Sequence, residues 1–109
     1  MQAHLSLSFT NDRAASVVLV RGSTELAIGD AAGSREQVTS ETGGLGDAVH
    51  GLSCAVLDNP DAAGSVTYKV QFRCRTTPDT AYVNRSNDDT DTASFSRAVS
   101  TLFLQEIMG

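Results

Sequence analysis

Alternation of apolar and polar side chains dominates the sequence and predicts β-strands. The longest example is residues 65–75, where valine, tyrosine, phenylalanine and cysteine alternate with threonine, lysine, glutamine and arginine. The spacing repeats near the N-terminus, where three apolar residues alternate with three polar ones: Leu5, Leu7 and Phe9 against His4, Ser6 and Ser8. Strands of this kind bury one face and expose the other to water, which is typical of antiparallel sheets.

Shorter apolar or β-branched runs extend the pattern at residues 17–20, 26–28 and 52–56. Clusters of Gly, Pro, Asn, Asp, Ser and Thr separate the runs and predict turns. No segment has a convincing helical pattern, so a parallel sheet with crossover helices is disfavoured. We therefore expect one all-β domain over residues 1–109, an antiparallel β-sandwich or jelly roll.

The C-terminal segment, residues 100–108, carries apolar side chains on both faces. This pattern predicts a central strand, or a strand that meets a partner chain. A helix is the alternative, but Ser100 and Thr101 begin one poorly unless one of them caps it. Four residues of the segment are expected in contacts between subunits or in the core: Leu102, Phe103, Leu104 and Ile107.

Composition adds a reason for self-association. The chain has 109 residues, of which 40% are hydrophobic, but it has four Phe, two Tyr and no Trp. Large anchors for a deep core are therefore few, and apolar surface is stabilised by about 25 cal/mol per Å² when it leaves water. Such a domain would gain from burying surface against copies of itself.

Charge excludes two classes of partner. The formal net charge is -5, and the basic residues stand singly apart from Arg73 and Arg75. Without a basic stripe, neither a nucleic acid nor an anionic membrane surface is an expected partner. Apolar runs such as residues 17–20 are far shorter than the roughly 20 residues that span a bilayer.

Candidate catalytic groups do not combine into a motif. His4 and His50 have no Cys, Asp or Glu at a metal-ligand spacing, and no nucleophile-elbow motif occurs. Cys54 and Cys74 fall on the inward faces of their strands, where cysteine usually packs as a small hydrophobe. Whether these two cysteines pair stays open at this point. We expect no catalytic residue, no cofactor and no enzymatic activity.

An acidic turn near the C-terminus offers a weak cation site. Asn87, Asp89 and Asp91 place oxygen atoms at alternate positions, as in half of a calcium loop. Thr92 and Ala98 stand where an EF-hand would need Gly and Glu. The prediction is therefore a solvated turn with no metal, and cation binding is the alternative.

The same turn has an expected structural role beside the final strand. Asn84 and Asp88 are expected to bond to their own backbone, and Arg85 to pair with Asp89 or Asp91. A functional alternative is that this turn and the glycine-rich loop at 43–47 form a distal surface that contacts a host glycan or protein.

Several segments of the sequence resemble a known group of proteins. They lie at residues 19–35, 67–71, 82–91 and 100–107, in the expected order. Together they resemble the β-rich head or tip domains of bacteriophage fibres and other capsid-associated virion proteins. The resemblance implies a jelly-roll-like head that closes as a homotrimer around a three-fold axis, without a catalytic residue. It also implies a place in the virion and contacts with other virion proteins or a host receptor, as a fibre tip or a capsid decoration.

Two other functions remain as alternatives. The first is a soluble calcium- or glycan-binding β-sandwich of cellular origin, for which calcium bound at Asn87, Asp89 and Asp91 would be the distinguishing sign. The second is an enzyme, which would need a deep pocket that brings His4 or His50 beside a carboxylate.

Overall fold

The computed structural model describes residues 1–9, 14–43, 48–61, 63–74 and 80–107. Within these residues all regular structure is β-strand, and every paired strand is antiparallel. The strands form two four-stranded sheets. Their bounds are β1 Gln2–Phe9, β2 Ala14–Arg21, β3 Thr24–Leu26, β4 Ser40–Gly43, β5 His50–Ala55, β6 Tyr68–Cys74, β7 Ala81–Val83 and β8 Thr101–Phe103.

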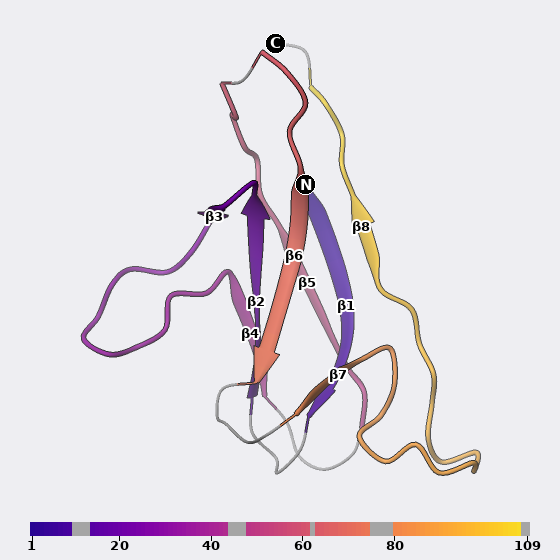
Figure 1. Cartoon of the computed structure of the whole chain (residues 1–109). Helices are drawn as coiled ribbons and strands as arrows, with labels where there is room; N and C mark the ends of the chain where they lie inside the picture. Colours follow the sequence, from indigo (N-terminus) through magenta and orange to yellow (C-terminus); the bar gives the residue numbers. More distant parts are fainter. Residues whose placement is uncertain (10–13, 44–47, 62, 75–79, 108–109) are drawn as a thin grey trace.

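The two sheets are organised alike. In the sheet that we call sheet A, β1 is central, β5 pairs with one edge, and the short strands β7 and β8 share the other edge. In sheet B, β2 is central, β6 pairs with one edge, and the short strands β3 and β4 share the other. Figure 1 shows β8 along the side of the molecule opposite β3 and β4. The all-β, antiparallel prediction is therefore confirmed at the level of a β-sandwich.

The sheets pack face to face and bury the odd-numbered residues of both central strands. The molecule is flat and long, with extents of 49 × 35 × 17 Å. The predicted inward face of the N-terminal strand is confirmed, because Leu5, Leu7 and Phe9 are all buried. The core cluster consists of Ala3, Leu5, Leu7, Phe9, Ala15, Val17, Leu19, Leu26 and Leu52.

A threonine hydroxyl closes the gap between the two short strands of sheet B. Thr39 lies between the end of β3 and the start of β4, and its N–H donates to the Val17 carbonyl at 2.9 Å. Its hydroxyl accepts from the Leu19 N–H at 3.0 Å and donates to the Leu26 carbonyl at 2.9 Å. The edge of β2 is therefore bonded across the break between β3 and β4.

A serine closes the equivalent gap in sheet A, between β7 and β8. The Ser100 hydroxyl accepts from the Ser6 N–H at 3.1 Å and donates to the Asn84 side-chain oxygen at 2.6 Å. The Asn84 N–H donates to the Ser6 carbonyl at 2.7 Å, and the Ser6 hydroxyl donates to the Val99 carbonyl at 3.1 Å. These bonds hold the C-terminal chain against β1.

Two details of the predicted alternation are wrong. Ser6 and Ser8 were expected on a wet face, but both are buried. Their hydroxyls donate to the Val99 and Arg85 carbonyls, because the chain that follows β7 returns past them. Conversely, Phe72 was expected to be buried, yet 39% of its surface is exposed.

Candidate functional site

The predicted contact residues of the C-terminus lie together on an exposed apolar segment. Leu102, Phe103, Leu104 and Ile107 keep between 45% and 69% of their surface exposed, and Val99 keeps 72%. Exposed apolar side chains that form a contiguous patch mark interaction surfaces more often than isolated exposed apolar residues do. We call these five residues the C-terminal apolar segment.

The segment forms a strand, as predicted, but a shorter one, and of the two predicted placements the central one is wrong. Of residues 100–107, Thr101–Phe103 form β8. The strand pairs with Gln2–His4 of β1 at the rim of sheet A, so it is an edge strand and not a central one. Met108, which was included in the predicted strand, lies outside the described residues.

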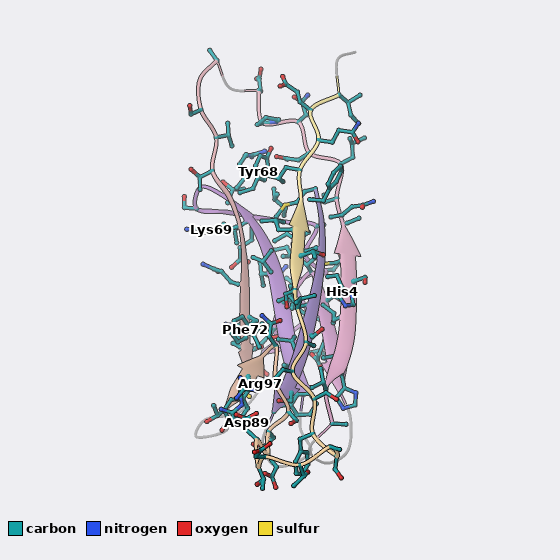
Figure 2. All side chains as sticks on the ribbon, turned by 90° about the vertical axis from the view of Figure 1, so that its right-hand side faces the viewer. His4, Tyr68, Lys69, Phe72, Asp89 and Arg97 are labelled. Carbon is teal, nitrogen blue, oxygen red and sulfur yellow. The ribbon has the colours of Figure 1, made fainter. Side chains whose placement is uncertain are left out.

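The sandwich is open on the side where β8 and β6 lie. By their register, Phe72 pairs with Val17 and Val83 pairs with Leu7, so both side chains point toward the interior. They nevertheless keep 39% and 37% of their surface exposed. Figure 2 views this side and shows Phe72 and Lys69 on one side of β8 and His4 on the other. The alternation in the sequence located these strands, but it gave no sign that this side of the core would be uncovered.

The exposed edge carries no charge that would discourage pairing. Residues 98–105 contain no Asp, Glu, Lys or Arg. Natural proteins usually protect exposed strand edges with charged residues or proline, because an unpaired edge can bond to another chain. The edge strand β8 carries neither kind of protection, because residues 98–105 contain no proline either.

His4 occupies a shallow hollow on the outer face of sheet A. Its Nδ1 forms a 2.9 Å hydrogen bond with the Ser53 hydroxyl of β5. A Cβ placed on Gly51 would lie 3.1 Å from the imidazole, so glycine leaves room for the ring. The hollow has a volume of about 410 Å³ and is lined by Gln2, Ala3, His4, Ser53, Cys54, Ala55 and Thr101. It contains a His–Ser pair, but no carboxylate lines it.

His50 lies apart from this hollow. Its ring stacks on Phe9, with the ring centroids 5.7 Å apart and the planes at 19°. Its Nε2 is buried and has no hydrogen-bond partner in the described structure. The two histidines, singled out from the sequence, are therefore not brought together: His4 is on the outer face of sheet A and His50 packs against the core.

The turn after β7 is ordered by its own side chains, partly as predicted. Asn84 has a positive φ of 67°, and its side-chain oxygen is bonded as described above. The Asp88 carboxylate accepts from the Thr90 N–H at 3.0 Å and from the Thr90 hydroxyl at 2.6 Å. These two bonds lower the pKa of Asp88 below its usual range. The predicted side-chain bond to the local backbone is therefore confirmed for Asp88, whereas the Asn84 side chain bonds to Ser100 instead.

The predicted partner of Arg85 is wrong. Its guanidinium donates to the Ser86 carbonyl at 3.1 Å and to the Asn87 carbonyl at 3.0 Å, and it lies 4.4 Å from the centre of the Tyr82 ring. Arg97 takes the expected place beside Asp89, because an isolated bridge between residues 85 and 97 brings the two chain segments together.

The Arg97 guanidinium donates hydrogen bonds to both carboxylate oxygens of Asp89, and the bond from Nε to Oδ1 is 2.7 Å long. This pair lowers the pKa of Asp89. Asp91, the third oxygen of the candidate calcium loop, is exposed. The described residues contain no group of three or more His, Cys, Asp or Glu side chains placed to hold a metal ion.

The two cysteines are not joined by a disulfide, because they lie in different sheets, Cys54 in β5 and Cys74 in β6. Burial raises the pKa of the Cys54 thiol, which keeps it protonated and weakly nucleophilic. Residues 44–47 of the glycine-rich loop lie outside the described part of the chain.

One polar cluster had no signal in the sequence. Asp58, in the loop after β5, accepts 2.7 Å bonds from Arg21 and a 2.8 Å bond from the Tyr68 hydroxyl. Burial alone would raise the pKa of Asp58, but the bonds from Tyr68 and Arg21 and the Arg21 charge together lower it. The hydrogen bond to Asp58 raises the pKa of Tyr68. The cluster ties this loop to one end of the sandwich.

Comparison with known proteins gives no identification: no family model matches the sequence, and neither a curated protein nor a solved structure matches the chain. In the part of the chain that the structure describes, no helix has the length and hydrophobicity needed to cross a membrane.

Proposed function

We propose that this chain is a non-enzymatic structural module that works by assembling with copies of itself, as a homotrimer in a virus particle. The observation that carries the proposal is the C-terminal apolar segment beside the open side of the sandwich, where large apolar side chains face solvent and residues 98–105 carry no charge. Leaving this surface in water would expose an unpaired strand edge to aggregation.

Symmetric assembly can cover such a surface in every copy through one kind of contact. Homo-oligomers close around rotation axes, so one patch on the chain is covered in every copy at once. A trimer also agrees with the oligomeric state implied by the resemblance of several sequence segments to virion proteins. The pairing of the first strand with the last, β1 with β8, supports a jelly-roll-like closure of the sandwich. In this setting the module contacts other virion proteins or a host receptor.

The first test is the solution mass of the purified chain, measured by light scattering over a range of concentrations. A homotrimer of the 11.4 kDa chain has a mass of about 34 kDa, three times that value. A mass of one chain at every concentration would overturn the assembly proposal. A stable mass of two chains would keep self-association and reject the trimer.

The second test locates the surface. Leu104→Asp and Ile107→Asp each place a charge on the C-terminal apolar segment, and both are expected to shift the mass to that of one chain. The matched control is Gln71→Asp on β6, an exposed position on the outer face of sheet B, which is expected to leave the mass unchanged. Equal trimer mass in all three variants would show that this segment is not the contact.

A further inference from the structure

The two outer faces of the sandwich differ sharply in charge. On sheet B, the outward positions include Glu25, Glu41, Lys69 and Arg73. On sheet A, the described outward positions hold no Asp, Glu, Lys or Arg. They are Gln2, His4, Ser6, Ser8, Gly51, Ser53, Ala55, Tyr82, Thr101 and Phe103. Depletion of charge distinguishes the core of protein interfaces from the rest of a surface.

Half of this uncharged face is open. Ser6 and Ser8 are buried beneath the chain that follows β7, whereas Gln2, His4 and Phe103 are exposed. The open half therefore lies around the start of β1, between β5 and β8. It is continuous with the C-terminal apolar segment, because Phe103 belongs to both.

The open half carries a projection and a hollow side by side. Phe103 and Ala55 both pair with Gln2, on opposite edges of β1. Phe103 is 55% exposed and stands at one edge, and the 410 Å³ hollow around His4 lies beside it. The hollow is shallow and open to solvent, so an aromatic side chain of a second copy can enter it.

From this geometry we propose that copies of the chain meet through the outer face of sheet A, with Phe103 of one copy seated in the hollow around His4 of the next. The inference rests on the proposed self-assembly and adds the face and the contact through which it takes place. Because each copy carries both the projection and the hollow, the same contact repeated by a three-fold rotation satisfies every copy and closes the trimer.

Charge favours a second copy as the occupant. Each chain carries a formal charge of -5, so two copies repel each other unless they meet through a surface that carries no charge. Packing sheet A faces together turns the charged faces of sheet B outward to water. A standard interface takes about 800 Å² from each partner, roughly a ninth of the 7157 Å² that this chain exposes.

The test is Ala55→Arg, which fills the hollow with a long charged side chain at an exposed position. Gln71→Arg on the outer face of sheet B is the matched control. The expected result is the mass of one chain for Ala55→Arg and the wild-type mass for Gln71→Arg, with circular dichroism unchanged in both. Phe103→Ala removes the projection without adding charge, and is expected to raise the dissociation constant of the assembly at least about tenfold.

The outcomes separate this inference from the proposed function. If Ala55→Arg and Phe103→Ala keep the wild-type mass while Ile107→Asp dissociates, the assembly stands and this face is not its contact. If the wild-type chain is a single copy at all concentrations, both proposals fail. Should Ala55→Arg unfold, Phe103→Ala decides alone: an unchanged dissociation constant overturns the inference.

Discussion

Arg21 and Asp58 are 37 residues apart in the sequence, yet the Arg21 guanidinium lies 2.7 Å from both carboxylate oxygens of Asp58. The side chains are 23% and 13% exposed, so the pair is partly shielded from water. Tyr68 donates a third hydrogen bond to the same carboxylate. This arrangement fixes the loop after β5 against the ends of β2 and β6.

Asp58→Asn should therefore destabilise the fold in a manner that depends on pH. Removing a charged partner from a shielded bond typically costs about 1 to 3 kcal/mol. The pKa of Asp58 is lowered in the folded chain, so its contribution is present above the unfolded value of about 4 and is lost as pH falls through the lowered value. Urea unfolding at neutral pH should show the full difference from wild type, and the difference should shrink in acid. Asp61→Asn, an exposed position in the same loop, is the control, and an equal loss in both variants would contradict the assignment.

Thr39→Val tests the hydroxyl that bridges the break between β3 and β4. Valine keeps the shape of threonine but leaves the Leu19 N–H and the Leu26 carbonyl without their partner. We expect a loss of about 1 to 3 kcal/mol in unfolding free energy. Thr24→Val on β3, where the side chain is exposed, should change it little. If chemical denaturation gives the same value for both variants, the bridge contributes nothing.

The sequence predicted the strands because local alternation determines them. Leu5, Leu7 and Phe9 are buried by the period of two that a strand imposes. The same period misplaced Ser6 and Ser8, since a chain more than 75 residues further along covers them. Periodicity reports which face of a strand a residue lies on, but not what later packs against that face.

The candidate site could be predicted in part for the same reason. The apolar character of Leu102 to Ile107 is visible in the sequence, and the structure exposes these residues. Their position at a sheet edge depends on pairing with β1, almost a hundred residues earlier, which no local pattern encodes. The contacts of His4 with Ser53 and of Asp89 with Arg97 are likewise products of topology.

Calcium should not stabilise the folded chain. Both carboxylate oxygens of Asp89 accept hydrogen bonds from Arg97, and Oδ1 of Asp88 accepts two hydrogen bonds from Thr90. A cation would have to displace these bonds before it could bind at Asn87, Asp89 and Asp91. Thermal melts should therefore agree with and without millimolar calcium, since a ligand that binds the folded state raises the melting temperature. A calcium-dependent rise that Asp89→Asn abolishes would favour the calcium-binding alternative over the structural module.

Asn84 combines a backbone role with a side-chain role, and two substitutions separate them. Its φ of 67° lies in the left-handed region, which strains most residues with a Cβ by roughly 1 to 2 kcal/mol but is tolerated by asparagine and by glycine. Its side-chain oxygen accepts the 2.6 Å bond from Ser100 that holds the C-terminal chain at the edge of β1. Asn84→Gly loses the bond alone, whereas Asn84→Ala loses the bond and adds strain. Both should lower the free energy of unfolding, and alanine should cost more than glycine. Because β8 follows Ser100 directly, hydrogen exchange at residues 101–103 should also quicken in both variants, and unchanged protection there would show that β8 is held without this bond.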